Sequence, residues 1–476
     1  MQPTPEVAAE ISKCSQPVRD YFQHLQECNI KLAQENQSLA AQLNQTSANS
    51  HRPPSSEPFI KPKSLRQKTG RKPGGQPGHP GKTLHRVHHA DQVVTLHVDC
   101  CDHCGLDLSE VEAHGVMRRQ KSDVEIRSYS TDYYAEKKIC PRCQWPVTAD
   151  FPAGVSHYIQ YGPTISAIMV YLNQGNNVPY DRLAKVSRDV FNIPLSQGTL
   201  VNMVEECGMS LKDSMDFIKK QLLAAPVLNA DETGIRVKGE LRWIHSLSNQ
   251  LYTYIETHTK RGNKATEDIG LLPNYCGILI HDFWKSYFAY MNCLHALCNA
   301  HLLRELTGIV ENFHWKWAAD MKALLTEIHV HVKAEGGFLT GETLADYRKR
   351  YDQILTEGQL ENPVNSSAQP PPPIKRGRVK KTKAQNLWER MFQYKDDILR
   401  FTTDADIPFD NNQAERDIRM SKLFQKVSGG FRSENGNIYF GRIRSYISSA
   451  QKQGHSMYDA LLMAANKAPL FTSQTQ

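Results

Sequence analysis

Two aspartates stand at the ends of short apolar runs, where they could act together on a metal ion. Asp231 follows Pro226-Val-Leu-Asn-Ala230, and Asp282 follows Gly277-Ile-Leu-Ile-His281. Both runs are typical of buried strands. An ionised carboxylate at the end of such a strand is costly unless it is paired or bound to a metal. Either residue alone is equally consistent with a turn or a cap, but together they predict a site for Mg²⁺ or Mn²⁺, which prefer carboxylate oxygens.

A third acid, Glu415, lies in the segment Pro408–Arg416, which is typical of a helix start. It could complete a set of three carboxylates with the two aspartates. The alternative is a capping box in which Asn412 is the N-cap and Glu415 stands three residues on, with Arg419 pairing to Glu415 one turn later. The sequence leaves both roles open.

Four cysteines form two Cys-x-x-Cys pairs, Cys101 with Cys104 and Cys140 with Cys143. Four thiolates at this spacing can close a tetrahedral Zn²⁺ site. Residues 124–134, between the two pairs, alternate like a strand. We therefore expect a zinc-ribbon-like module in which the metal contributes folding free energy. The alternative is a set of four reduced structural cysteines.

Charge and composition favour a nucleic-acid-binding protein that does not enter a membrane. The chain has 476 residues, 40% of them hydrophobic, which is enough for two or more domains. No apolar run approaches the ~18 residues of a membrane span, and residues 1–10 lack the pattern of a secretory signal. We therefore expect a cytoplasmic protein without a disulfide framework. The net charge of +7 is concentrated in a few segments, which favours phosphate contacts.

Positive charge gathers in two segments of biased composition. Residues 47–89 have no acid after Glu57, and their Gly70-Arg-Lys-Pro73 resembles a hook that enters the minor groove of DNA. Residues 361–383 contain a run of prolines followed by a basic cluster. The alternative is a pair of solvated linkers. The residues expected to contact double-stranded DNA are Arg71, Lys72, Lys375, Arg376 and Arg378.

A heptad pattern runs from Phe22 to Leu43 near the N-terminus. Leu25, Leu32 and Leu39 share one core position, and asparagines recur at the other. Asparagine at a core position costs stability but can select the register of a parallel pair. We expect a short leucine-zipper-like coiled coil that makes the protein a homodimer or a higher oligomer. A solitary amphipathic helix is the alternative.

The elements that must position the acids follow from periodicity. Helices are expected from residue 161, with a second start signal at the N-cap candidate Ser196, and this helical pair could be a helix-turn-helix or packing for the next domain. Helices are also expected from about 292 to 333 and from 387 onward. The predicted strands are Val227–Asp231, Leu241–Leu247, Leu251–Glu256 and Gly277–Asp282.

The fold class expected is multidomain α/β, in six parts. The expected boundaries are 15–46 for the coiled-coil helix, 47–89 for the basic linker, 90–155 for the zinc-binding module, 156–222 for the helical, possible DNA-binding segment, 223–450 for the domain that carries the acids, and 451–476 for a C-terminal helix and tail.

Taken together, these motifs resemble those of the insertion sequence 66 family of bacterial transposases. The resemblance covers most of the chain from about Gly70 onward, and the order and combination of the motifs are highly specific. The matching motifs are Gly70-Arg-Lys-Pro-Gly-Gly-Gln-Pro-Gly-His-Pro-Gly81, the paired Cys-x-x-Cys, Ala230-Asp-Glu-Thr-Gly234, Asp282 followed by Tyr287 or Tyr290, Cys298-Asn-Ala-His301 with Arg304, Pro408-Phe-Asp-Asn-Asn-Gln-Ala-Glu-Arg416, and Lys426-Val-Ser-Gly-Gly-Phe-Arg432.

The resemblance implies a DDE transposase with an RNase H-like mixed sheet, whose catalytic acids are Asp231, Asp282 and Glu415. Two divalent ions held by such acids activate an attacking oxygen and stabilise a leaving oxygen during phosphodiester displacement. The attacking oxygen belongs to water when the element end is nicked and to the freed 3′ hydroxyl when it is joined to target DNA. The long gap before Glu415 suggests an insertion at about 305–388. The motif with Cys298, His301 and Arg304 has no chemical role that we can derive from the sequence.

Two other functions also fit these motifs. A catalytically inactive, zinc-containing DNA-binding regulator derived from a transposase would keep the basic arms, although the presence of all three acids argues against it. A structural scaffold in which the aspartates cap strands is the other alternative. The expected partners are element-end and target DNA, further copies of the chain and accessory proteins encoded by the element.

Overall fold

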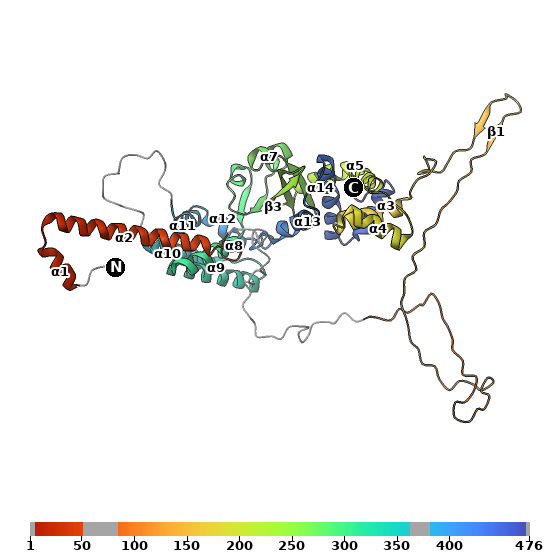
Figure 1. Cartoon of the computed structure of the whole chain (residues 1–476), viewed down its shortest axis with the longest axis horizontal. Helices are drawn as coiled ribbons and strands as arrows, with labels where there is room; N and C mark the ends of the chain where they lie inside the picture. The colour runs from red at the N-terminus through yellow and green to blue at the C-terminus, as the bar shows by residue number, and fades with distance from the viewer. Residues whose placement is uncertain (1–4, 51–83, 362–380, 473–476) are drawn as a thin grey trace. The chain divides into compact units, whose positions relative to one another are not determined.

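The computed structural model describes residues 5–50, 84–361 and 381–472 (Figure 1). The chain divides into two compact units, residues 65–132 and the rest. Within the described ranges, no helix combines the length and the apolar character that a membrane span requires. The residues expected to contact DNA, namely Arg71, Lys72, Lys375, Arg376 and Arg378, lie outside the described residues.

A five-stranded mixed sheet organises the larger unit, so the fold class is mixed α/β. The strand order is β5-β4-β3-β6-β7. β3, β4 and β5 pair antiparallel, whereas β6 runs parallel to β3 and β7 runs parallel to β6. The strands are β3 (Val227–Val237), β4 (Glu240–Ser248), β5 (Thr253–His258), β6 (Ile278–His281) and β7 (Leu294–Leu297).

The β3–β4 hairpin is closed by a two-residue turn at Lys238 and Gly239. Their φ angles are 51° and 83°, and a turn with two left-handed residues matches the twist of hairpin strands. The antiparallel pairing runs from Val237 opposite Glu240 to Asn229 opposite Ser248. β3 is therefore the longest strand and the only one in the sheet that pairs with both the antiparallel and the parallel strands.

Helices form two groups with separate hydrophobic cores, and α13 (Asn412–Ser428) packs against β3 and β4 (Figure 1). The first group contains α3 (Pro163–Val170), the π-helix η2 (Tyr171–Gly175), α4 (Tyr180–Phe191), α5 (Gln197–Ser210), α6 (Lys212–Leu223), α14 (Glu434–Lys452) and α15 (Met457–Ala465). The second contains α8 (Asn299–Phe313), α9 (Lys316–Ala334), α10 (Gly341–Glu361), α11 (Lys383–Gln393) and α12 (Lys395–Leu399). The short elements are α7 (Asn263–Ile269) and the 3₁₀ turns Leu272–Asn274, Tyr287–Ala289 and Arg400–Thr402.

Helix α14 covers the free edge of β5. The hydroxyl oxygen of Ser445 accepts the backbone N–H of Ile255 at 2.8 Å. One turn later, the hydroxyl oxygen of Ser449 accepts the N–H of Thr253 at 2.9 Å. Gly441, one turn earlier, allows this approach, because a Cβ there would lie 2.9 Å from the Ile255 carbonyl oxygen. Small and hydroxyl side chains on one face of the helix thus satisfy an edge that would otherwise carry unpaired backbone groups.

Two helices, α1 (Pro5–Lys13) and α2 (Gln16–Leu43), precede the basic segment. The end of α2 lies against α8, where Gln37 Nε2 donates to the Asn312 carbonyl at 3.3 Å. The heptad leucines remain exposed, for example Leu32 at 56%. The helix expected over this region is present, and its pairing with a second copy stays a prediction.

Two expected elements are wrong. Residues 292–298 are not the start of a helix, because Leu294–Leu297 form β7 beside β6 and α8 begins only at Asn299. Residues 124–134 form no strand. Val124 is 77% exposed and Tyr134 is 91% exposed, so the alternation in this segment does not separate a buried face from an exposed face.

Candidate functional site

The two aspartates lie at one edge of the sheet. The parallel pairing of β3 with β6 ends where Asn229 lies opposite Ile280. Asp231 stands two residues beyond that point on β3, and Asp282 is the first residue after β6. The expectation that the first strand ends at Asp231 is wrong, since β3 continues in its hairpin with β4 to Val237. The parallel pairing of β3 with β6 stops at this point, so Asp231 and Asp282 lie at the same end of this pairing between two neighbouring strands.

Glu415 lies in the first turn of α13 and is not part of a capping box. The N-cap of α13 is Asn411 rather than Asn412, and it makes no side-chain cap hydrogen bond. The alternative role that the sequence left open for Glu415 is therefore wrong. Among the described residues, Arg419 makes no ion pair within 4.0 Å of Glu415, although its charge lowers the pKa of that carboxyl. The nearer basic groups are Arg304 Nη2 at 3.7 Å and His301 Nδ1 at 3.8 Å from Glu415 Oε1.

Asn411 fixes the start of α13 against the sheet. Its Nδ2 donates to the Ala230 carbonyl at 2.8 Å, and its Oδ1 accepts from Asn229 Nδ2 at 2.8 Å. Its backbone N–H donates to Cys298 Sγ at 3.2 Å. Asn411 is 2% exposed, so these bonds form away from water, where each is harder to replace. Asn411 thus joins β3, α8 and α13 next to Asp231.

The three acids interact electrostatically. Burial raises the pKa of the Asp231 carboxyl well above its ordinary value, and the negative charges of Glu232, Asp282 and Glu415 raise it further. Burial also raises the pKa of Glu415, while Arg304 opposes this shift. These charge effects on the pKa of Asp231 mean that the carboxyl groups repel one another when ionised. A divalent cation bound between them would favour their ionised forms.

Glu232, the neighbour of Asp231, belongs to a buried network that the sequence did not predict. Its side chain is 4% exposed, accepts the hydroxyl hydrogen of Tyr287 and binds Arg261 through Nε at 2.9 Å and Nη2 at 2.7 Å. The guanidinium of Arg261 lies over Trp284, 3.6 Å from the ring centroid. Tyr287 and Trp284 follow Asp282 closely, so this network ties the segment after β6 to β3. The sequence signal that could have revealed this network was the second acid, Glu232, directly after Asp231.

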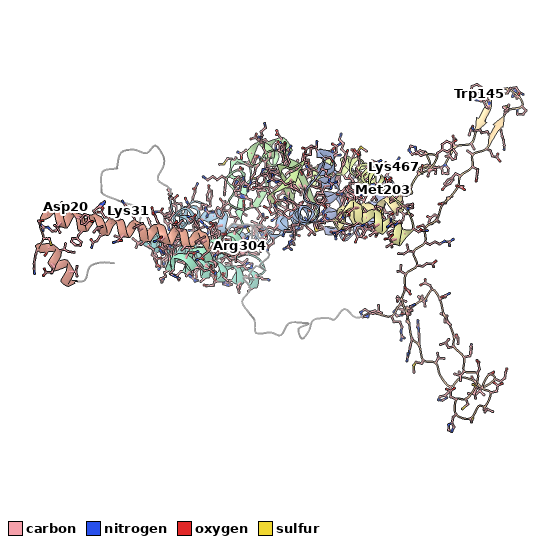
Figure 2. The ribbon with its side chains drawn as sticks, viewed as in Figure 1. Asp20, Lys31, Trp145, Met203, Arg304 and Lys467 are labelled. Carbon is pink, nitrogen blue, oxygen red and sulfur yellow. The ribbon has the colours of Figure 1, made fainter. Side chains whose placement is uncertain are left out.

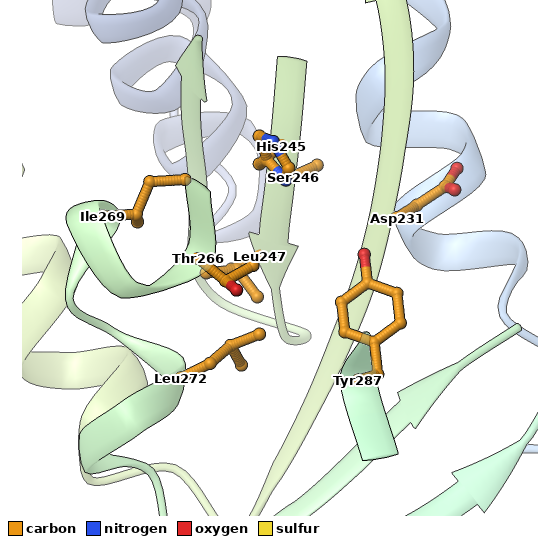
Figure 3. Close-up of a pocket in the computed structure, with 8 residues that line it drawn as sticks. All are labelled: Asp231, His245, Ser246, Leu247, Thr266, Ile269, Leu272 and Tyr287. Carbon is orange, nitrogen blue, oxygen red and sulfur yellow. The ribbon is translucent and has the colours of Figure 1, made fainter. Parts of the chain in front are cut away.

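A small cavity lies beside Asp231 (Figure 3). The hydroxyl group of Tyr287 points toward Asp231 in this view. The cavity has room for about one water molecule, so it is not a substrate pocket. The lining residues are Asp231, His245, Ser246, Leu247, Thr266, Ile269, Leu272 and Tyr287.

The sequence motif of unknown role lies against Glu415. Cys298 is the N-cap residue of α8, is 0% exposed, and its Sγ lies 3.2 Å from His301 Nδ1. Arg304 follows one turn later on the same helix (Figure 2). Among the described residues, the group of three potential ligands whose donor atoms all lie within 4.8 Å of one another is Cys298, His301 and Glu415. This group includes one of the three predicted catalytic acids.

Each Cys-x-x-Cys pair lies in a turn with the same hydrogen bonds. Gly105 N–H donates to the Cys101 carbonyl at 2.9 Å, and Gln144 N–H donates to the Cys140 carbonyl at 2.8 Å. Both donors have positive φ, 75° and 58°. Backbone and thiol hydrogen bonds from Cys104, with a further backbone bond from His103, lower the pKa of the Cys101 thiol.

The second pair repeats this pattern within a short hairpin. Backbone and thiol hydrogen bonds from Cys143 lower the pKa of the Cys140 thiol. The turn connects β1 (Lys137–Ile139) to β2 (Pro146–Thr148), and the Trp145 side chain projects from the hairpin tip (Figure 2). These hydrogen bonds therefore favour the thiolate forms of Cys101 and Cys140, and the thiolate is the form that binds zinc.

Comparison with known proteins identifies the family. Residues 158–438, more than half of the chain, match the model of the transposase IS66 family. The chain belongs to the IS66 transposase family. The matched range contains Asp231, Asp282, Glu415 and the motif at Cys298, and it ends within α14. The family is one of DDE-type transposases, so transposition is the biological process in which this chain takes part.

Other comparisons add less. Residues 3–85 match a family of unknown function (DUF6444). No curated protein matches the chain. One similar solved chain belongs to the cryo-EM structure of the simian T-cell lymphotropic virus intasome in complex with PP2A regulatory subunit B56 gamma, with 11% identity and a TM-score of 0.13. The match covers 45% of this chain and 80% of that chain, and similarity at this level does not define a fold.

Proposed function

We propose that this IS66 family member is an active DDE transposase that cleaves and joins DNA at the ends of an insertion sequence. The observation that carries the proposal is that Asp231 and Asp282 stand at the same end of the parallel pairing between two neighbouring strands, while Glu415, in the first turn of α13, lies near enough that its charge and that of Asp282 raise the pKa of Asp231. An RNase H-like architecture fits this placement, because its first and fourth strands are neighbours, as β3 and β6 are, and the helix with the third acid packs across the sheet.

The donor set fits Mg²⁺ or Mn²⁺. Carboxylate oxygens are hard ligands, which suit these ions. The cations whose charge reaches the acids are Arg304, Arg416 and Arg419 near Glu415 and Lys422 near Asp231. When bound, two such ions supply activation of the attacking oxygen and stabilisation of the leaving oxygen. Asp231 from β3, Asp282 from the end of β6 and Glu415 from α13 would hold these ions.

The chain's own residues perform the positioning. Asn411 holds the start of α13, which carries Glu415, on β3 beside Asp231, and Glu232 with Arg261 and Tyr287 holds the segment after Asp282. Lys422 Nζ donates to the Gly234 carbonyl at 2.8 Å. Burial lowers the pKa of Lys422, and the negative charge of Asp231 opposes this shift. These contacts keep three acids from three elements in one arrangement without the ions.

DNA would be held by parts of the chain outside the acid cluster. In α5, Ser196 is the N-cap and its hydroxyl oxygen accepts the Thr199 N–H at 3.0 Å, so the helix start predicted at Ser196 is present. The exposed side chains of α5 include Gln197 and Asn202, which have the donors and acceptors that base edges require. We propose that α4 and α5 contact element-end DNA and that the basic segments add phosphate contacts.

A structural Zn²⁺ is proposed for Cys101, Cys104, Cys140 and Cys143. The identical turns and the lowered thiol pKa values of Cys101 and Cys140 support it. The thiolates prefer zinc and the carboxylates prefer magnesium, so the two kinds of metal would occupy different sites.

The function is tested by cleavage of DNA that carries the element end, in Mg²⁺. Asp231→Asn and Glu415→Gln keep side-chain shape, and each should lower cleavage by orders of magnitude while DNA binding and folding persist. Asp346→Asn is the control, since its carboxylate is 64% exposed and lies in α10. Near-normal cleavage by Glu415→Gln would refute the three-carboxylate mechanism, and DNA binding without cleavage by the unaltered protein would favour the regulator.

A further inference from the structure

We propose that Cys298, His301 and Glu415 form a second divalent-metal site, selective for a soft ion such as Zn²⁺, and that an ion bound there withdraws Glu415 from the catalytic centre. Binding of the ion stands on its own geometry. The inhibition rests on the proposed function, because it requires Glu415 to be a catalytic ligand. The protein would thus contain an inhibitory zinc site that is separate from its paired cysteines.

Three donors of the types that zinc prefers already face one another. Cys298 Sγ and His301 Nδ1 are 3.2 Å apart, and His301 Nδ1 and Glu415 Oε1 are 3.8 Å apart. All three donor atoms lie within 4.8 Å of one another. In tetrahedral zinc coordination, with Zn–S near 2.3 Å and Zn–N or Zn–O near 2.0–2.2 Å, neighbouring donors are separated by about 3.4–3.6 Å. The observed spacings lie close to these values, so small side-chain rotations suffice.

The backbone that carries the donors is fixed. Cys298 and His301 are three residues apart at the start of α8, and the Cys298 sulfur also accepts the N–H of Asn411 at the start of α13. The same sulfur therefore touches both helices that supply ligands. A site assembled on two helix starts that are already joined needs little ordering when the ion binds.

Access and selectivity follow from burial and ligand type. Cys298 is fully buried, whereas the side chains of His301 and Glu415 are 18% and 38% exposed, so an ion can enter from their side. Burial raises the pKa of the Cys298 thiol to about 12, so an ion must displace the thiol proton. Thiolate and imidazole ligands favour Zn²⁺ over Mg²⁺. Ordinary Mg²⁺ concentrations should therefore leave this site to zinc.

Binding is tested with Co²⁺, a spectroscopic substitute for zinc, on full-length protein whose paired cysteines have been loaded with zinc. We expect one equivalent of Co²⁺ that gives a thiolate-to-cobalt charge-transfer band, distinct from any Co²⁺ held by carboxylates, which gives no such band. Cys298→Ser should remove that band, and the exposed-thiol variant Cys276→Ser should retain it. His301→Asn is the second test, in case Cys298→Ser does not fold. An unchanged band in a folded Cys298→Ser or His301→Asn variant would overturn the site.

Inhibition is tested by element-end cleavage in Mg²⁺, with and without a small excess of Zn²⁺. We expect zinc to lower the rate by an order of magnitude or more in the unaltered protein and in Cys276→Ser. The ratio of the two rates should approach unity in His301→Asn, whatever its rate in Mg²⁺ alone. Zinc inhibition of His301→Asn equal to that of the unaltered protein would overturn the proposal that this site inhibits cleavage. If the unaltered protein binds the extra Co²⁺ but does not cleave DNA in Mg²⁺, the proposed catalytic function fails and the metal site stands.

Discussion

At the scale of single residues, the roles of the acids depend on neutral partners that hold them. Asn411 contacts Asn229, the Ala230 carbonyl and the Cys298 sulfur. No charge or metal-ligand rule distinguishes Asn411 from Asn412 in the sequence, because both fit the N-cap preference. The distinction arises only when β3 is beside the start of α13 and one amide side chain can bridge them.

Asn411→Asp tests this bridge. The substitution keeps the acceptor for Asn229, but it replaces the donor to the Ala230 carbonyl by a carboxylate oxygen. Two acceptors would then face each other in a buried place, which typically costs about 1–3 kcal/mol. We expect a lower midpoint of urea unfolding and weaker Mg²⁺-dependent cleavage. Asn412→Ser is the control, since Asn412 is exposed. Equal unfolding midpoints for Asn411→Asp and the unaltered protein would mean that the bridge contributes nothing.

At the scale of elements, the strands were predictable where apolar residues form runs, and much less so elsewhere. β5 and β6 were expected nearly as observed. The second half of β3 was missed because Glu232 and Gly234 are poor strand formers that the hairpin with β4 stabilises. β7 was missed because its four residues lead directly into α8. Pairing, rather than intrinsic preference, defines both segments.

The contact between α14 and β5 predicts the effect of a larger side chain at Gly441. A Cβ at this position would lie 2.9 Å from the Ile255 carbonyl oxygen, and backbone cannot rotate away as a side chain can. Gly441→Val should lower the free energy of unfolding by about 1–3 kcal/mol, as overpacking usually does. Urea unfolding followed by tryptophan fluorescence measures this. Gly115→Val should have no effect, since nothing lies within 4 Å of its added Cβ; stability equal to that control would show that α14 can move.

The two cysteine turns predict the metal content of purified protein. Because four thiolates fill a tetrahedral shell, we expect about one tightly bound Zn²⁺ per chain, without an open position for catalysis. Cys104→Ser should release this zinc and increase proteolysis between residues 101 and 143. Cys276→Ser should leave the zinc content unchanged. Elemental analysis that finds no zinc in protein purified without chelator would contradict the structural site.

At the scale of the whole molecule, the sequence predicted the individual motifs and strands better than it predicted the contacts that join them. The family motifs predicted the three acids, and the apolar runs predicted most of the strands of the sheet. The network of Glu232, Arg261 and Tyr287 joins segments far apart in the sequence, so it could not be predicted without the strand order. The cluster of Cys298, His301 and Glu415 required α8 and α13 to start side by side, and the helices between them form a separate core.

Self-association is the last consequence of this organisation. The proposed joining of two element ends would bring copies of the chain together, and α2 offers a row of leucines that could pair them. Leu32 and Leu39 are 56% and 57% exposed on a helix whose end is held by α8 through Gln37. Exposed leucines at heptad positions are stable in water when a second helix covers them.

Leu32→Glu should weaken self-association without disturbing the acids. The charge would be buried between two helices in a pair, whereas it stays in water on a single chain. Ser38→Glu adds the same charge to α2 outside the leucine row and is the control. Light scattering should give a dimer or larger species for the unaltered protein and for Ser38→Glu, and a smaller mass for Leu32→Glu. Element-end nicking by single chains should persist in Leu32→Glu, while coupled joining of two ends should fall. An unchanged mass for Leu32→Glu would mean that pairing depends on another surface.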